Sequence, residues 1–421
     1  MILSRFLNHM IRVGRLTLVD ANGKLHEFSG APGPEATVRL HDRSLHRKLF
    51  LNPNLYLGEA YMDGTLTIEQ GTLRDFLGIA VRNLEFAQSF PAYSVYETLS
   101  RMFRLTQQYN PVSRAKAHVA HHYDLAARFY DLFLDRDRQY SCAYFRHAGD
   151  GLEQAQQDKR RHIAAKLLLQ PGQRILDIGS GWGGLSLYLA GVAEGQVTGL
   201  TLSREQLQTA RQRALEAGLE ARVRFHLRDY REEKGRYERI VSVGMFEHVG
   251  VAYYREFFRR IGALLTDDGV CLLHSIGRMA GPSTTGDWTR KYIFPGGYAP
   301  ALSEVLPAVE KAGLWVTDIE MLRRHYADTL HAWQQRFQAN RARAVALYDE
   351  RFCRMWEFYL ALGEAAFRHG DHIVFQMQLA KDRDAVPVTR DYMAEWEQAR
   401  RQTETRAHLA TPARPAIRAK G

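Results

Sequence analysis

A glycine-rich turn, ILDIGSGWGG at residues 175–184, has the composition of a cofactor-binding loop. Glycines let the backbone approach a ligand closely, and Asp177 in front of them can orient the turn or contact a polar group. The spacing of Gly179, Gly181 and Gly184 also fits the fingerprint of dinucleotide-binding proteins, so the glycines alone leave NAD open. Many α/β proteins carry such a turn without this kind of cofactor. The turn therefore predicts a candidate site whose ligand must be decided by other residues.

A lone cysteine, Cys142, lies among aromatic residues in YSCAYF at residues 140–145. As a thiolate it could be a nucleophile or a metal ligand, and as a thiol it could be packed inertly in the core. A nucleophile would need a neighbouring base and an electrophilic substrate. The residues by themselves leave all three roles open.

Histidine and glutamate residues add further candidates. His118 and His122 are four residues apart, so on a helix they would share a face and could bind a metal. With no third ligand nearby, we expect no metal site. His274 ends the apolar run VCLLH, and the carboxyl ends of such strands are where open α/β sheets bind ligands. Glu247 and His248 are adjacent in a loop, so their side chains should point in different directions.

Hydrophobic periodicity identifies the elements that must position these residues. From about residue 170 the chain alternates short apolar strands with amphipathic helices, the pattern of a doubly wound α/β sheet. Both the glycine-rich turn and His274 come directly after or at the end of such strands. The expected strands are QRILDIG, QVTGLTLS, RVRFHLRDY, RYERIVSVGMF, VCLLHSIG and HIVFQMQLAK.

The two ends of the chain follow other patterns. GRLTLVDANGKLHEFSG alternates apolar and polar residues around Asn22 and Gly23, which indicates a hairpin, and a polar stretch near Asn110 is the best domain boundary. The last residues are polar, basic and dotted with proline. We therefore predict a small α+β domain over residues 1–112, a catalytic domain over residues 113–395 and a basic, disordered tail over residues 396–421.

Composition limits the class of protein. With 421 residues, 45% of them hydrophobic, the chain can bury a large core, and its three cysteines form no even disulfide framework. We expect no cleaved secretory signal, and no apolar stretch approaches the ~20 residues of a membrane-spanning helix. The net charge of +10 favours an anionic partner, and both anionic lipid and nucleic acid fit.

Several segments occur together in the order found in the cyclopropane-fatty-acyl-phospholipid synthases, and the chain resembles that family from about residue 115 to residue 395. The family is itself similar to the mycolic acid cyclopropane synthases and related lipid methyltransferases. Asp177 ahead of the glycines looks like the first motif of the class I methyltransferases, whose ligand is S-adenosylmethionine. The resemblance thus implies a Rossmann-like class I methyltransferase fold. The segments are HYDLAARFYDLFLDRDRQYSCAYF, ILDIGSGWGG, GLTLSREQ, RIVSVGMFEHVG, LLHSIG, YIFPGG and DAVPVTRDY.

The resemblance implies a reaction on lipid. A methylene group would pass from S-adenosylmethionine to the double bond of an unsaturated acyl chain in a membrane phospholipid, and bound bicarbonate would deprotonate the carbocation to close a cyclopropane ring. One rival is methyl transfer without ring closure, which would give a methyl-branched or methyl-alkene chain. A rival of another class is a basic nucleic-acid-binding protein or RNA methyltransferase, but we find no asparagine-proline-proline-tyrosine type signature.

The resemblance also implies the site residues. Bicarbonate would be held by Cys142, Glu247, His274, Tyr326 and the backbone of Ile276, so that Cys142 is an ion ligand and not a nucleophile. The residues expected around S-adenosylmethionine are Tyr123, Tyr140, Ser141, Asp177, Gly179, Ser180, Gly181, Thr201, Leu202, Gln206, Asp229 and Tyr230.

The same resemblance and the basic charge imply the cellular setting. We expect a cytoplasmic homodimer that associates peripherally with the inner face of the cell membrane, on an anionic surface, and that binds no nucleic acid.

Overall fold

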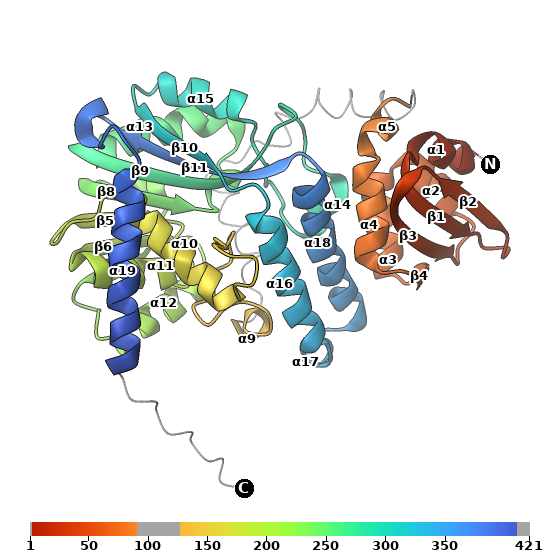
Figure 1. Cartoon of the computed structure of the whole chain (residues 1–421), viewed down its shortest axis with the longest axis horizontal. Helices are drawn as coiled ribbons and strands as arrows, with labels where there is room; N and C mark the ends of the chain where they lie inside the picture. Colours follow the sequence, from red (N-terminus) through yellow and green to blue (C-terminus); the bar gives the residue numbers. More distant parts are fainter. Residues whose placement is uncertain (1, 91–126, 411–421) are drawn as a thin grey trace, which may run out of the picture.

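The computed structural model describes residues 2–90 and 127–410, and its largest element is a seven-stranded sheet (Figure 1). The strand order is β10-β11-β9-β8-β5-β6-β7. Strands β5 to β9 run parallel, whereas β11 is antiparallel to both of its neighbours. This topology confirms the predicted doubly wound α/β fold. The strands are β5 (Arg174–Ile178), β6 (Gln196–Thr201), β7 (Val223–Leu227), β8 (Tyr237–Val243), β9 (Leu265–Arg278), β10 (Trp315–Met321) and β11 (His372–Ala380).

Helices cover both faces of this sheet, which explains why its strands are apolar on both sides. Successive strand residues point to opposite faces, so Leu272 packs with α10, α11 and α12 while Leu273 packs with α13 and α15. The same alternation turns His274 towards the face that α10 covers. The helices are α10 (Leu152–Lys166), α11 (Gly184–Ala193), α12 (Arg204–Glu216), α13 (Tyr254–Leu264) and α15 (Leu302–Glu310).

Residues 2–90 form a second unit around a four-stranded sheet with the order β2-β1-β3-β4. β1 and β2 make the predicted hairpin, and Gly23 in its turn has a φ of +82° that glycine adopts easily. Helices α16 (His325–Ala339) and α18 (Glu350–His369) lie between this unit and the large sheet, and α3 and α4 pack on α18 (Figure 1). The predicted boundary at residue 112 lies outside the described residues. The elements are α1 (Ile2–Met10), β1 (Val13–Val19), β2 (Leu25–Ser29), β3 (Ala31–Leu40), α2 (Leu45–Leu51), α3 (Pro53–Met62), β4 (Leu66–Gln70), α4 (Leu73–Arg82) and α5 (Leu84–Gln88).

The helical region after the large sheet's β10 has three parts. α16 (His325–Ala339) is followed by α17 (Arg341–Leu347) and α18 (Glu350–His369). The Asp349 side chain caps α18 by accepting a hydrogen bond of 2.7 Å from the Phe352 N–H. These helices complete the apolar core that the two units share.

The predicted disordered tail is wrong as far as residue 410, because α19 (Asp391–Ala410) runs through it. Figure 1 shows α19 lying along α10. Glu397 Oε1 is 2.6 Å from His162 Nδ1, and Glu404 Oε2 accepts a hydrogen bond of 2.5 Å from Arg161. The composition of this segment suggested a solvated chain, but its charged residues pair with charged residues buried on α10.

Candidate active site

The carboxyl ends of the parallel strands meet at one edge of the large sheet, and two adjoining cavities lie there. The smaller, of about 160 Å³, lies over the ends of β5, β6, β7 and β8. The larger, of about 750 Å³, extends from the end of β9 towards α4, α16 and α18. Tyr140, Ser141, Gly244 and His248 line both, so groups bound in the two cavities could meet.

The smaller cavity is lined by every predicted cofactor residue that the structure describes. Tyr123 lies outside the described residues, as do His118 and His122. The lining follows from the fold, because each of the loops after β5, β6 and β7 contributes a part of the wall. The predicted residues on this wall are Tyr140, Ser141, Asp177, Gly179, Ser180, Gly181, Thr201, Leu202, Gln206, Asp229 and Tyr230.

Two contacts hold the first loops of this cavity in place. Asp177 Oδ2 accepts a hydrogen bond of 2.6 Å from the Ser186 hydroxyl, which ties the end of β5 to α11. Burial raises the pKa of Asp177 to about 6, and the bond from Ser186 opposes that rise. After β6, the Thr201 hydroxyl donates to Gln206 Oε1 at 2.9 Å. The carboxyl group of Asp177 and the side-chain amide of Gln206 are therefore oriented before any ligand binds.

Asp229 is engaged more fully than the sequence suggested. Its two carboxylate oxygens accept hydrogen bonds of 2.8 Å each from the Arg231 guanidinium. A carboxylate oxygen can accept further bonds, so the expected place of Asp229 beside S-adenosylmethionine stays a prediction.

Gly181 leaves room on the wall of the smaller cavity. It has a φ of +53°, and a Cβ built at this position would meet no other atom within 4 Å. Gly179, by contrast, would bring a Cβ to 2.9 Å from the Met245 side chain. The space in front of Gly181 therefore belongs to the cavity and suits a ligand held against the backbone.

The larger cavity brings together Cys142, Glu247, His274, Ile276 and Tyr326, which the sequence scatters over nearly two hundred positions. They come from the loop before α10, the turn after β8, the end of β9 and the start of α16. The rest of the wall is rich in aromatic side chains. These are Tyr140, Phe294, Tyr298, Tyr359 and Phe367.

Cys142 is 1% exposed, and burial raises the pKa of its thiol well above the usual range, although Lys159 opposes the rise. A thiol in this environment stays protonated at neutral pH, and here it donates to the Ala143 carbonyl at 3.3 Å. The environment therefore disfavours the thiolate that a nucleophile or a metal ligand requires.

Glu247 presents an incompletely bonded carboxyl group to the cavity. Its Oε1 accepts a hydrogen bond of 2.7 Å from the Ile276 N–H, whereas its buried Oε2 has no hydrogen-bond partner among the described residues. Burial raises the pKa of Glu247 to about 7, and the Ile276 bond opposes that rise. An unsatisfied buried carboxylate oxygen is costly, so Oε2 is a candidate acceptor for a hydrogen-bond donor bound in the cavity.

His274 is 2% exposed and is held neutral. Burial lowers the pKa of its imidazole well below the usual range, and the cations Lys159, Lys166 and His162 lower it further. Its Nδ1 is 3.2 Å from the side-chain nitrogen of Gln376. Neutral His274 therefore faces the larger cavity as a hydrogen-bonding group without charge.

Some residues near the site were not predicted from the sequence. Lys159 of α10 is fully buried and donates a hydrogen bond of 2.8 Å to the Ser141 hydroxyl, and burial lowers its pKa to about 7. For Gln376 the sequence predicts only a place in the strand HIVFQMQLAK. The glutamines at positions 376 and 378 in that strand could have indicated polar partners near the site, because buried amides need hydrogen-bond partners.

Comparison with known proteins gives concordant matches. The model of the family described as mycolic acid cyclopropane synthetase matches residues 111–377. The probable fatty acid methyltransferase of Pseudomonas putida is 37% identical, over 85% of this chain and 89% of the relative. The cyclopropane-fatty-acyl-phospholipid synthase of Escherichia coli K12 is 36% identical, over 82% of this chain and 88% of the relative.

A solved structure gives the same picture. Mycolic acid cyclopropane synthase CmaA1, complexed with SAH and CTAB, superposes with a TM-score of 0.61 at 34% identity. The match covers 65% of this chain and 99% of that chain.

Proposed function

Since this chain belongs to the mycolic acid cyclopropane synthetase family and is an S-adenosylmethionine-dependent enzyme of the methyltransferase class, we propose that it builds cyclopropane rings on phospholipid acyl chains. The substrate would be the double bond of an unsaturated chain still esterified in a membrane lipid. The observation that carries this proposal is the junction of a cavity lined by the predicted cofactor residues with a larger, aromatic-lined one that contains an unsatisfied carboxylate.

The smaller cavity fits S-adenosylmethionine, which when bound supplies an electrophilic methyl group. The open space before Gly181 allows close approach of a ligand to the backbone. Gln206 and Thr201 offer polar groups at the end of β6 for hydroxyl groups of a ribose. Tyr140 and Ser141 line both cavities, so they would lie between the cofactor and the acyl chain.

The polar end of the larger cavity fits bicarbonate, which when bound supplies a base. Glu247 Oε2 can accept a hydrogen bond from a hydroxyl group. The Tyr326 hydroxyl can donate to anionic oxygens, as can the Cys142 thiol once it turns from the Ala143 carbonyl, and the neutral His274 ring adds another polar contact. The backbone N–H of Ile276 donates to Glu247, so we propose that it orients this ligand instead of contacting the ion.

The apolar part of the larger cavity fits an acyl chain. Its volume of about 750 Å³ lies within the roughly 300–1,000 Å³ typical of ligand sites. Aromatic faces such as those of Tyr140, Phe294 and Tyr359 can stabilise positive charge on a bound chain by roughly 0.5–2 kcal/mol each. Tyr298 and Ala299 also line this cavity and would border the substrate.

Methyl transfer without ring closure is the rival reaction, and the name of the Pseudomonas putida relative is consistent with it. Mass spectrometry of phospholipid acyl chains after incubation with S-adenosylmethionine separates the two. A mass gain of one methylene together with loss of the double bond and no branched product supports cyclopropane formation. Methyl-branched or methyl-alkene chains would support the rival, and unchanged chains beside methylated RNA would contradict both.

Cys142→Ser should retain measurable turnover, with a loss of about tenfold, because a serine hydroxyl can still donate a hydrogen bond to an ion. Added bicarbonate should restore part of that loss, since mass action refills a site of lowered affinity. Turnover is measured by the same mass spectrometry at several bicarbonate concentrations. A loss of many orders of magnitude, or a covalent Cys142 adduct trapped during turnover, would show that the thiol is a nucleophile instead.

We also propose that the enzyme works as a homodimer at the anionic inner face of the cytoplasmic membrane. Within the described ranges, no helix combines the length and the apolar composition that crossing a bilayer requires. With a net charge of +10, vesicle binding should depend on anionic lipid and weaken as salt rises, at about 1 kcal/mol for each basic residue near the surface. Sedimentation with anionic and neutral vesicles at low and high salt measures this. Equal binding to both vesicle types would contradict the electrostatic explanation.

A further inference from the structure

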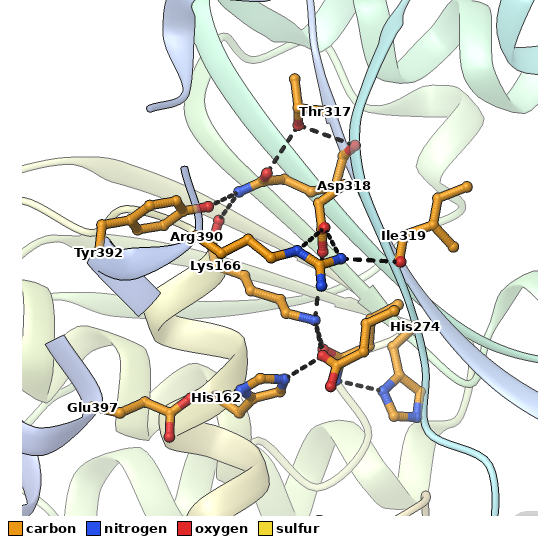
Figure 2. Close-up of polar contacts among 12 residues, drawn as sticks. His162, Lys166, His274, Thr317, Asp318, Ile319, Arg390, Tyr392 and Glu397 are labelled. Carbon is orange, nitrogen blue, oxygen red and sulfur yellow. Dashed lines mark hydrogen bonds and ion pairs between the residues drawn. The ribbon is translucent and has the colours of Figure 1, made fainter. Parts of the chain in front are cut away.

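A row of polar residues crosses three neighbouring strands directly behind the larger cavity. In the strand register, His274 of β9 is opposite Gln376 of β11, and Gln376 is opposite Glu320 of β10. By this register all three side chains are on the sheet face that α10 covers, where Lys166 at the end of α10 donates hydrogen bonds to Gln376 and Glu320. Figure 2 shows Lys166 on the same side of the sheet as His274. The register fixes this arrangement, since a slip of one residue would turn Gln376 to the opposite face.

Lys166 determines which way the Gln376 amide points. Its ammonium group donates a hydrogen bond of 2.8 Å to Gln376 Oε1 and another to Glu320 Oε2. An ammonium group has no acceptor, so the amide atom that faces it must be the oxygen. The amide nitrogen of Gln376 is then turned to His274, where it lies 3.2 Å from Nδ1.

The orientation of this amide in turn selects a form of His274. An amide nitrogen can only donate, so Nδ1 must accept and carries no proton. Neutral imidazole has one N–H, which is therefore on Nε2, the ring nitrogen turned away from Gln376. Because His274 lines the larger cavity, Nε2–H is a hydrogen-bond donor available to a group bound there.

We infer that Lys166, acting through Gln376, is a positioning residue that holds His274 as its Nε2–H form and so equips the larger cavity to bind an anion. The role of this donor in turnover rests on the proposed function, whereas the form of the ring does not. The groups that face this part of the site are Lys159, His162 and Lys166 from α10, Glu320 from β10 and Gln376 from β11.

A second layer of charges keeps Lys166 in place. Glu320 Oε2 is 2.6 Å from His162 Nε2, and Glu397 Oε1 of α19 is 2.6 Å from His162 Nδ1 (Figure 2). Both ring nitrogens of His162 face carboxylate oxygens, which only accept, so both carry a proton and the ring is cationic. Burial would lower the pKa of His162, but the two carboxylates raise it above its ordinary value. Burial likewise lowers the pKa of Lys166, and ionised Glu320 opposes this and keeps the ammonium form. α19 therefore contributes to the site through His162, Glu320 and Lys166.

The test is nitrogen-15 NMR of the full chain labelled at histidine, with His274→Gln used to assign the His274 signals. The wild-type protein should show an unprotonated Nδ1 and a protonated Nε2 at neutral pH. In Gln376→Glu, a carboxylate replaces the amide and can only accept, so Nδ1 should gain a proton. Turnover of that variant should fall by about 10- to 100-fold, the range found when hydrogen-bond partners of metal-binding histidines are changed.

Gln378→Glu is the matched control. Gln378 lies on the same face of the same strand, but its side chain donates to the Lys166 backbone carbonyl at 2.5 Å and to the Tyr392 hydroxyl at 2.8 Å. A carboxylate there should lower thermal stability at least as much as in Gln376→Glu while leaving the His274 nitrogen shifts unchanged. Equal shifts in both variants would overturn the specific role of Gln376.

The two proposals fail separately. The positioning role would be overturned if wild-type His274 is protonated on Nδ1, or if its nitrogen shifts do not change in Gln376→Glu. Either result would count even if the enzyme makes cyclopropane rings. The expected shifts in a protein that modifies no lipid would support the positioning role and contradict the proposed function.

Discussion

Glu247→Gln should lower turnover by about 100- to 10,000-fold, because it removes a ligand of the proposed bicarbonate, and loss of a positioned base costs a factor in this range. The substitution keeps the shape of the side chain and the hydrogen bond from the Ile276 N–H, which the amide oxygen can accept. It replaces Oε2, which has no partner among the described residues, with an NH₂ group that cannot accept a hydrogen bond. Affinity for S-adenosylmethionine should not change, because Glu247 lines only the larger cavity. Product mass spectrometry and calorimetry measure the two quantities.

Glu233→Gln is the control for this substitution. Glu233 is also buried and also accepts backbone hydrogen bonds, from Lys234 and Gly235, but it lines neither cavity. It should cost stability without a comparable loss of turnover. The pKa of Glu247 near 7 adds a second readout, since its carboxylate is lost as the pH falls through that value. Wild-type turnover should decline below about pH 7, and the residual turnover of Glu247→Gln should lack that step; near-normal turnover in the variant would refute the role of Glu247.

The strands and the chemistry at their ends could be predicted because both leave local signals. Apolar runs such as RILDI and VCLLH mark the strands, and in a parallel sheet their carboxyl ends must meet at one edge. Residues placed on motifs, such as Gly181 and Glu247, therefore lie in the cavities although no periodicity connects them. Tyr123 is the one predicted site residue whose place lies outside the described part of the chain.

The row of polar residues behind His274, with the charged residues that hold Lys166 in place, could not be predicted in the same way. Lys166 ends a helix rich in charged residues, and Glu397 lies in a segment whose composition is typical of a solvated chain. Each is buried only because the other elements bring opposite charges to it, through Glu320 and His162. Composition reports the average environment of a residue type, whereas these contacts depend on the register of β11 and on the packing of α19 against α10.

Gly181→Val should weaken S-adenosylmethionine binding by about 100-fold. The new side chain would enter the smaller cavity, because a Cβ at Gly181 meets no protein atom within 4 Å and the residue lines the cavity wall. Overpacking of a filled site costs about 1–3 kcal/mol, which corresponds to roughly 5- to 150-fold in affinity, and a β-branched residue at a φ of +53° adds strain. Calorimetric titration with S-adenosylmethionine measures the change.

Gly172→Val separates the loss of space from the strain of the backbone. Gly172 has a φ of +82° and open space around its Cβ position, but it is exposed in the turn before β5, at the opposite end of the strand from Gly181. Both variants should lose similar thermal stability, since both place valine in a left-handed conformation. Only Gly181→Val should lose affinity, because only there does the side chain occupy the space that the cofactor requires. Unchanged affinity in Gly181→Val would show that the cofactor does not bind at this turn. Equal losses of affinity in both variants would show that backbone strain, and not lost space, causes the effect.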